Sequence, residues 1–414
     1  MKRVLPLFAM LLTASLALAE GNWPQWRGPD RTGVSDETGL LKSWPANGPR
    51  KAWTFNDAGL GYSSFSIVGN RLYTMGSRNN KEQLICVDMT NGKEVWSANV
   101  GDHFKNRWGD GPRTTPTVAG DYVYAMGGNG DLVCASTKDG KPVWSKSMTR
   151  DLGGKTPGWG YTESVRVDGD KVLGTQGWRV GAIAALNAKT GDVIWQSKQF
   201  TDGAQYSSII VAEHGGKRQY IQLTMNSVVG VEADSGKLLW RSDWPGRTAV
   251  IPTPIYHDGH VFITSGYGVG CKLIKLSDDN KASDVYTSKT IVNHHGGVIL
   301  VGDYLYGHSD TEGWVCMEFK TGKLMWNEKR GVGKGAIGYA DGMLYCLGER
   351  SGDVALVKAT PEGYDEVSRF KLDPQSKQRS NSGGIWPHPT ITGGKLYLRD
   401  QEFISCYDVK ANTN

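Results

Sequence analysis

Six short segments of the sequence gather residue types that bind anions and flat rings. Tyrosine and tryptophan rings offer faces for stacking, and arginine and lysine form charge-assisted hydrogen bonds with carboxylates or phosphates. The candidate ligand-binding residues are Tyr62, Arg113, Trp159, Tyr161, Glu163, His294, His295, Lys334, Trp386 and His388. Together they predict a site for a small anionic or sugar-like ligand, and no catalytic residue is assigned among them.

The adjacent histidines His294 and His295, with His308 further along the chain, raise the question of a metal site. Neighbouring residues on a strand point to opposite faces, so only one of the adjacent pair can face a shared centre. A protein metal site usually needs three or four converging ligands. The sequence therefore predicts no metal site.

The elements that must position these residues repeat along the chain. One phrase is a polar turn ending in glycine, followed four residues later by tryptophan. Its clear copies end at Trp96, Trp144, Trp195, Trp240 and Trp326, and Trp53 belongs to a copy without its preceding turn. A second phrase, two short strands around a glycine turn as in residues 118–124, recurs in phase with the first. Each unit thus holds four short strands, A to D.

The spacing of these units predicts an all-β fold, an eight-bladed β-propeller with four-stranded blades. The units recur every 45 residues or so, and a period of about 45 residues is that of a propeller blade. The last unit, at residues 403–408, lacks its tryptophan strand, whereas the first tryptophan strand, at residues 51–55, lacks a preceding unit. Pairing the two closes one blade from N- and C-terminal strands and removes open sheet edges.

The repeated tryptophans and cysteines are expected to be structural. We expect Trp53, Trp96, Trp144, Trp195, Trp240 and Trp326 to lie flat against the turn of the next blade, where each buries a large area. Cys86, Cys134 and Cys316 lie ten residues before their tryptophan, and Cys406 takes the same place in the last blade. Such a slot suits a small buried thiol. Equivalent positions in neighbouring blades are too far apart for a disulfide, so six free thiols are expected.

In a propeller of this kind, the connections from strand D to strand A surround one mouth of the central channel. The ten candidate residues are therefore expected to converge there. B-to-C loop residues that could also reach this mouth are Gln176, Trp178, His308, Asp310 and Arg350. The alternative is structural: Tyr62, Trp159 and Trp386 would seal the channel, while Arg113 and Glu163 would be polar links between blades.

The N-terminus has the pattern of a secretory signal peptide. A basic start, Met1-Lys2-Arg3, precedes a mostly apolar stretch and the small-residue site Ala17-Leu18-Ala19. The expected organisation is a signal peptide at 1–19, an extension packing on the propeller at 20–49, the propeller at 50–410 and a tail at 411–414. The predicted location is the periplasm or the outside of the cell, with no membrane anchor, because no later segment could span a bilayer. The net charge of +5 is too small and dispersed for a nucleic-acid partner.

The turn-Gly-Lys-x-x-Trp phrase resembles the tryptophan-docking repeat of pyrroloquinoline quinone (PQQ) propellers, over about residues 50–410. This group includes quinoprotein alcohol dehydrogenases and the BamB outer-membrane assembly lipoprotein. Residues 22–29, Asn-Trp-Pro-Gln-Trp-Arg-Gly-Pro, resemble the start of many exported PQQ-like propeller proteins known only by their fold. The resemblance implies a fold more than an activity, because one fold hosts many functions.

Two classes of function follow from this resemblance. The first is a scaffold that binds a small ligand or a protein partner, although no cysteine follows the cleavage site to carry a BamB-like lipid anchor. The second is a PQQ-dependent alcohol or sugar dehydrogenase, which implies PQQ with Ca²⁺ stacked on a ring of two adjacent disulfide-bonded cysteines. The sequence has neither a Cys-Cys pair nor a Cys-x-x-Cys-His haem motif. The scaffold is therefore favoured, and an enzyme of this kind would be a PQQ-dependent oxidoreductase.

Overall fold

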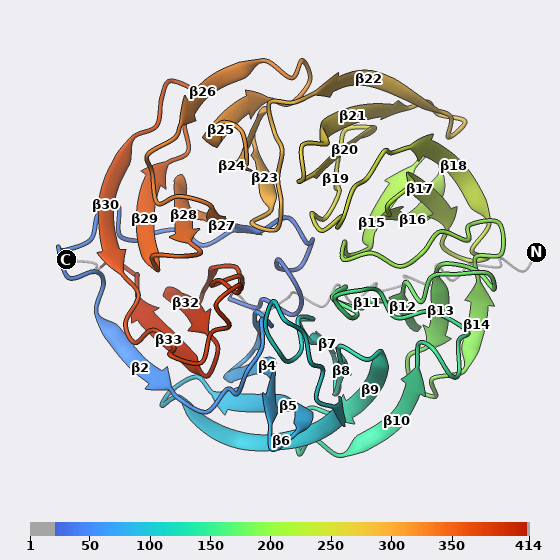
Figure 1. Cartoon of the computed structure of the whole chain (residues 1–414), viewed down its shortest axis with the longest axis horizontal. Coiled ribbons are helices and arrows are strands. Elements are labelled where there is room, and N and C mark those ends of the chain that lie inside the picture. Colours follow the sequence, from blue (N-terminus) through green and yellow to red (C-terminus); the bar gives the residue numbers. More distant parts are fainter. Residues whose placement is uncertain (1–20, 412–414) are drawn as a thin grey trace, which may run out of the picture.

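Residues 21–411, the part of the chain that the computed structural model describes, form eight four-stranded blades in a closed ring (Figure 1). Residues 1–20 and 412–414, and with them the expected signal peptide and most of the expected tail, lie outside the described residues. Each blade pairs neighbouring strands antiparallel, with strand A on the inside and strand D on the outside. The predicted all-β, eight-bladed propeller is confirmed.

The first four blades follow the chain without interruption. They comprise β3 (Ser66–Val68), β4 (Arg71–Arg78), β5 (Lys81–Asp88) and β6 (Lys93–Asp102); β7 (Thr117–Ala119), β8 (Tyr122–Met126), β9 (Asp131–Ser136) and β10 (Pro142–Ser147); β11 (Arg166–Asp168), β12 (Lys171–Gly174), β13 (Ala184–Asn187) and β14 (Val193–Gln196); and β15 (Ile210–His214), β16 (Lys217–Leu223), β17 (Ser227–Glu232) and β18 (Leu238–Asp243).

The other four blades include the two that take strands from the N-terminal region. They comprise β19 (Ile255–His257), β20 (His260–Ser265), β21 (Gly270–Leu276) and β22 (Ala282–Ser288); β23 (Val298–Val301), β24 (Tyr304–Ser309), β25 (Gly313–Glu318) and β26 (Leu324–Glu328); β27 (Gly335–Ala340), β28 (Met343–Gly348), β29 (Asp353–Lys358) and β30 (Glu366–Lys371), joined by β1 (Val34–Ser35); and β31 (Thr390–Thr392), β32 (Lys395–Asp400), β33 (Phe403–Asp408) and β2 (Lys51–Phe55).

The ring closes where β2 pairs antiparallel with β33. Trp53 lies opposite Cys406, and Phe55 lies opposite Ile404. The blade that contains the C-terminal strands thereby receives its outer strand from the N-terminal side of the chain, as the sequence predicts. Without this pairing β33 would present an unpaired edge, which favours aggregation.

The tryptophans join each blade to the next through a hydrogen bond and a face contact. The indole Nε1 of Trp53, Trp96, Trp144, Trp195 and Trp326 donates to a backbone carbonyl in the C-to-D turn of the next blade, over 2.7–3.2 Å. Beneath four of these rings, those of all but Trp326, the turn requires glycine: a Cβ at Gly140 would lie 2.5 Å from Trp96, and one at Gly236 would lie 2.4 Å from Trp195. The positive φ of these glycines also favours a residue without a Cβ.

Trp240 departs from this pattern, because the following turn at residues 277–281 contains no glycine. Its Nε1 donates instead to the side-chain oxygen of Gln219, 2.6 Å away, and the amide of Gln219 donates to Asn280 in that turn. The indole still packs against the next blade, in a cluster with Ile274 and Leu276. The single hydrogen bond that the other indoles donate is thus replaced by two hydrogen bonds through the side chain of Gln219.

The spacing of ten residues between cysteine and tryptophan has a simple cause. Strands C and D pair so that Cys86 faces Trp96, Cys134 faces Trp144 and Cys316 faces Trp326. All six cysteines are buried, and the structure links none of them to another. The space left beside a docked indole therefore accepts only a small residue, such as cysteine, alanine or glycine.

A ring of hydroxyl side chains joins the inner strands where they begin. The backbone N–H of Ser64 donates to the hydroxyl of Thr115, that of Thr115 to Ser164, and that of Ser164 to Ser208. On the other side, the N–H of His388 donates to the hydroxyl of Ser64. These bonds satisfy buried backbone groups that have no ladder partner at the start of each inner strand.

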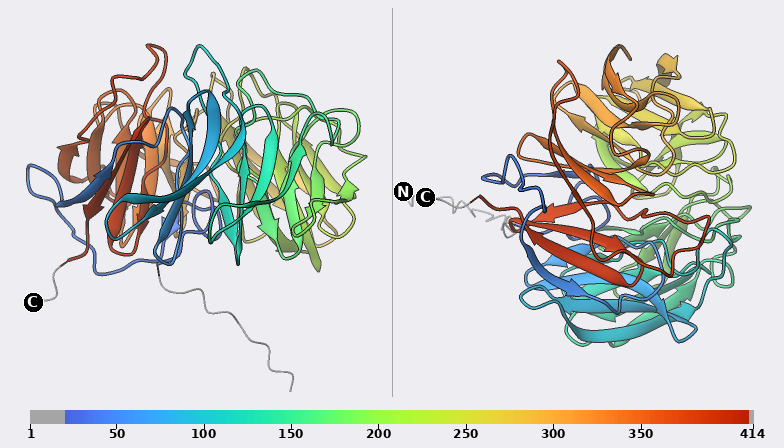
Figure 2. Two further views of the ribbon diagram at one scale, coloured as in Figure 1. Left: turned by 90° about the horizontal axis from the view of Figure 1, so that it is seen from below. Right: turned by 60° about the vertical axis from the view of Figure 1, so that its left-hand side comes forward.

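The segment before β2 lies across one end of the channel (Figures 1 and 2). Trp23 forms a bridge with Ile67, the carbonyl of Pro24 accepts the N–H of Val118, and β1 pairs in parallel with β27. In the side view of Figure 2 the long D-to-A connections rise from the opposite face. Among residues 21–411, no helix is long and apolar enough to cross a membrane.

Candidate functional site

The central channel holds a cavity of about 580 Å³, to which all eight D-to-A connections contribute residues. Its open side lies among these connections. At its other end it is lined by Trp26 and Arg27 of the N-terminal segment, so it is a well rather than a through-channel. A volume in this range suits a small organic ligand.

Eight of the ten predicted residues line this cavity. They are Tyr62, Arg113, Trp159, His294, His295, Lys334, Trp386 and His388. Among the aromatic walls, the rings of Tyr62 and Trp386 lie 4.6 Å apart, and the guanidinium of Arg113 lies 5.1 Å above the Tyr62 ring. Arg113 also donates to the carbonyls of Gly109 and Gly111, so it holds its own loop as well as facing the cavity.

Tyr161 and Glu163 lie elsewhere, and their predicted place at the channel mouth needs correction. The hydroxyl of Tyr161 donates to the carbonyl of Gln176, and its ring is buried in the packing between the second and third blades. Glu163 accepts the N–H of Thr175 at 2.7 Å and is fully buried. Side chains alternate along an extended segment, and here the residues that line the cavity are Thr162 and Ser164. Glu163 is therefore a structural group, as the alternative interpretation held.

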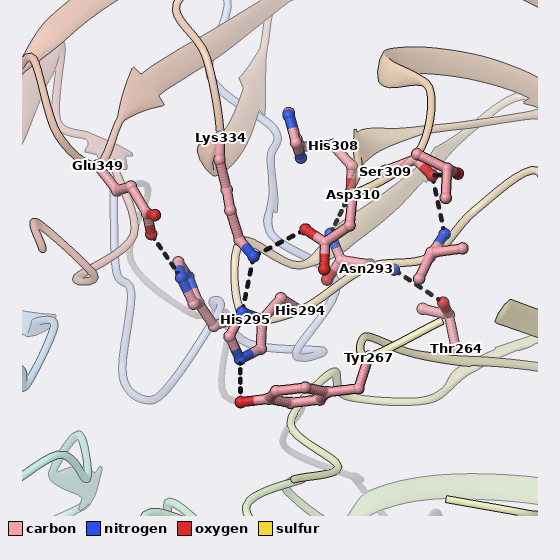
Figure 3. Close-up of polar contacts among 12 residues, drawn as sticks. Thr264, Tyr267, Asn293, His294, His295, His308, Ser309, Asp310, Lys334 and Glu349 are labelled. Carbon is pink, nitrogen blue, oxygen red and sulfur yellow. Dashed lines mark hydrogen bonds and ion pairs between the residues drawn. The ribbon is translucent and has the colours of Figure 1, made fainter. Parts of the chain in front are cut away.

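A chain of hydrogen bonds fixes the orientation of one wall (Figure 3). The ammonium of Lys334 lies 2.7 Å from Asp310 and donates to Nδ1 of His294 at 2.7 Å. Burial, together with the nearby charges of His295 and Lys334, lowers the pKa of His294 to about 3, so its single proton sits on Nε2. That nitrogen donates to the hydroxyl oxygen of Tyr267 over 2.8 Å. The Tyr267 hydroxyl can then donate its own hydrogen into the cavity.

A second pair of groups stands beside this chain. Nε2 of His295 lies 2.6 Å from Glu349, and Nε1 of Trp386 donates to the same carboxylate oxygen at 3.0 Å. Burial alone would raise the pKa of Glu349, but the hydrogen bond and charge of His295 outweigh it and lower the pKa to about 2. The carboxylate is thus ionised and already bound by two donors, which leaves it little capacity to bind a cation.

The cavity carries a net positive charge, although the ammonium of Lys334 is paired with Asp310. Five basic side chains line it, and Glu349 is the one carboxylate among the lining residues that the structure describes. The basic residues are Arg27, Arg107, Arg113, Lys334 and Arg350. In this low-dielectric cavity the basic side chains repel one another strongly and attract a negative charge strongly. A bound anion therefore relieves the repulsion, and the lining favours an anionic ligand.

Several lining residues were missed by reasoning from the sequence. Tyr267 and Glu349 belong to B-to-C loops, where the repeat has no fixed phase, although Glu349 immediately precedes the predicted Arg350. Trp26 and Arg27 come from outside the repeat altogether. Of the B-to-C candidates, Arg350 lines the cavity, Asp310 reaches it through Lys334, and the ring of Trp178 is exposed outside it.

A sequence profile described as outer membrane protein assembly factor BamB matches residues 80–328, more than half of the chain. The chain belongs to the BamB family. The curated BamB of Shewanella oneidensis is 25% identical over 267 residues, which cover 60% of this chain and 64% of that protein. The match thus spans less than two thirds of that relative's length.

Solved structures support this fold assignment. BamB from Moraxella catarrhalis aligns with a TM-score of 0.60 at 14% identity, covering 85% of this chain and 95% of that one. A quinohemoprotein alcohol dehydrogenase from Comamonas testosteroni aligns with a TM-score of 0.64 at 11% identity, covering 95% and 81%. At such identities the likeness shows a common propeller fold, and it assigns no activity to this BamB-family chain.

PQQ with Ca²⁺, the cofactor that resemblance to dehydrogenases implies, fits these residues poorly. No cysteine is among the described residues that line the cavity, so the disulfide ring beneath PQQ cannot form there. The lining carboxylate Glu349 is held by His295 and Trp386. Within residues 21–411, no three His, Cys, Asp or Glu side chains are grouped so as to hold a metal ion.

Acid should destabilise the folded chain through its buried histidines. Burial is the main cause that lowers the pKa of His294 to about 3, His308 to about 4 and His388 to about 3. The unfolded chain takes up these protons below the ordinary value of 6.5, and the folded chain does not, so stability is lost as pH falls from 6.5 towards 4. Replacing His388 by glutamine should reduce this slope by up to about 1.4 kcal/mol per pH unit.

Urea unfolding of both proteins at pH values from 4 to 7 measures this difference. Glu82 and Glu163, whose pKa values burial raises to about 7, act in the opposite direction, but they are present in both proteins and cancel. Parallel stability curves for the two proteins would show that His388 does not stay neutral in the fold.

Proposed function

We propose that this BamB-family propeller binds a small anionic ligand built on a ring, such as a uronic acid, in its central cavity. One observation carries the proposal: the well combines seven tryptophan and tyrosine side chains with five basic groups and a single, already bound carboxylate. Aromatic faces stack on rings, and basic groups bind acid groups through charge-assisted hydrogen bonds. The hydroxyl of Tyr267 supplies a further donor.

The direct test is calorimetric titration with D-galacturonate and D-glucuronate, with the uncharged parent sugars for comparison. We expect both acids to bind and the parent sugars to bind more weakly. A visible absorption titration with PQQ and Ca²⁺ tests the dehydrogenase alternative. Tight binding of PQQ, together with no binding of either sugar acid, would favour the dehydrogenase.

Trp386→Ala should lower the affinity for galacturonate roughly tenfold or more, because a stacking face is lost. The matched control is Trp178→Ala: that ring is 41% exposed, lies outside the cavity and stacks on Lys155 and Arg179 at the surface. Equal affinities in the two variants would place the ligand elsewhere.

A protein partner is the second candidate, favoured by membership of the BamB family. The outer strands carry exposed apolar side chains just before the docked aromatic residue, at Val95, Val143, Ile194 and Val285. We expect the mature chain in the periplasm, following the expected signal peptide. Val143→Lys should then reduce capture of an outer-membrane assembly complex by the tagged chain, whereas Trp386→Ala should leave it unchanged.

A further inference from the structure

Three arginine side chains within residues 21–411 are buried, and they differ in how completely their guanidinium nitrogens are bonded. Arg399 donates through all three nitrogens and lies near Asp400 and Glu402. Arg31 likewise donates through all three nitrogens, to Gln25, Ile209 and Val165, and is near Glu163. Arg27 is the exception.

The guanidinium of Arg27 is only partly bonded. Its Nη2 donates to the carbonyls of Thr32 and Val298, each at 2.6 Å, while Nε and Nη1 have no hydrogen-bond partner in the described part of the chain. The residue is 4% exposed, and like Arg31 and Arg399 it has no carboxylate among those residues within 4.0 Å; unlike them, it also has no acidic group that acts on its pKa, which burial alone lowers. A buried charge without a counter-charge costs free energy, so such a group is seldom kept for packing alone.

The free nitrogen points to the closed end of the cavity. A Cβ on Gly297 would lie 2.5 Å from Nη1 of Arg27 and 2.8 Å from Cε1 of His388, so only glycine lets these two side chains approach the backbone here as they reach the cavity wall. Arg27, Gly297 and His388 all line the cavity, and the ring of Trp26 lies 4.6 Å from that of His388. At this end the cavity is therefore lined by one basic and two aromatic side chains.

We infer that Arg27 forms an anion subsite at the closed end of the well, where it binds the acid group of the ligand. The inference rests on the proposed function for the rest of that ligand: its acid group lies on Arg27, and its ring faces Trp386 and Tyr62 towards the open side. The same subsite chemistry also accepts a free oxyanion. The N-terminal segment is thus part of the binding site, because it supplies the counter-charge that the ligand needs.

Two measurements on the full mature chain test this subsite. In crystals soaked in selenate, an anomalous peak is expected within hydrogen-bond distance of Nη1. In calorimetry, Arg27→Gln should lose at least about tenfold in affinity for D-galacturonate and leave any binding of D-galactose unchanged. The matched control is Arg350→Gln, the same change of charge at the open side, where the side chain is 61% exposed and the loss should be smaller.

Arg27→Lys keeps the positive charge and replaces the glutamine variant in this test if that variant does not fold. The lysine variant should still bind selenate but should bind galacturonate more weakly than wild type. The outcomes separate the two proposals. Selenate on Arg27 without any sugar acid binding supports the anion subsite and contradicts the proposed ligand. Galacturonate binding that is equal in wild type, Arg27→Gln and Arg27→Lys, with no selenate peak, overturns the subsite and leaves the proposed function standing.

Discussion

Replacing Trp195 by alanine is expected to lower the free energy of unfolding by about 3–5 kcal/mol, the range for truncating a buried aromatic side chain. Trp195 is 9% exposed, and its face covers Gly236 of the next blade. Its Nε1 donates to the carbonyl of Ala233 at 3.2 Å, and its ring packs in one cluster with Tyr220 and Val231. Truncation therefore opens a cavity between two blades and leaves a carbonyl unpaired.

Urea unfolding followed by circular dichroism measures this loss. Trp195→Phe keeps most of the buried area but not the hydrogen bond, so a smaller loss of about 1 kcal/mol or slightly more is expected. Trp178→Ala, at an exposed tryptophan, should change stability by no more than about 0.5 kcal/mol. If Trp195→Ala were as stable as Trp178→Ala, the tryptophans would not be what joins the blades.

The fold was predictable because its joints repeat in the sequence. The same geometric need, a glycine beneath an indole and a small residue opposite it, recurs at Gly92, Gly140, Gly191 and Gly236 and so becomes visible as a period. The closing pair Trp53 and Cys406 obeys the same register, although the two residues lie 353 positions apart in the sequence. Even the exception at Trp240 follows from a turn that visibly lacks glycine.

The candidate site was predictable only where it shares that period. Eight residues chosen by their distance from an inner strand do line the cavity, because every D-to-A connection delivers its end to the same mouth. The choice failed at Tyr161 and Glu163. Successive side chains of an extended segment point in opposite directions, so a choice that is wrong by one residue selects a side chain that points into the blades and not into the cavity. Tyr267, Glu349 and Arg27 could not be found in this way, since loops and the N-terminal segment follow no period.

The N-terminal segment holds two buried arginines, and the fuller bonding of Arg31 leads to a sharp expectation. Arg31 lies at the end of the channel and bonds to the carbonyls of Val165 and Ile209, so it links the third and fourth blades. Its charge also lowers the pKa of Glu163, which burial otherwise raises; the result is a pKa of about 7. Arg31→Met should therefore cost about 2–4 kcal/mol, because it leaves two buried backbone carbonyls without their donor and removes a positive charge near Glu163.

The loss in Arg31→Met should depend on pH in a defined direction. A folded-state pKa above the ordinary 4.5 means that the folded chain holds a proton that the unfolded chain releases, so stability falls as pH rises through that window. Without Arg31 the pKa of Glu163 rises further, and the variant should be weaker relative to wild type at pH 8 than at pH 5. Adding Glu163→Gln should abolish this dependence and restore part of the stability. Unfolding curves at the two pH values decide it, and a loss that is the same at both would mean that Arg31 acts through its carbonyl bonds alone.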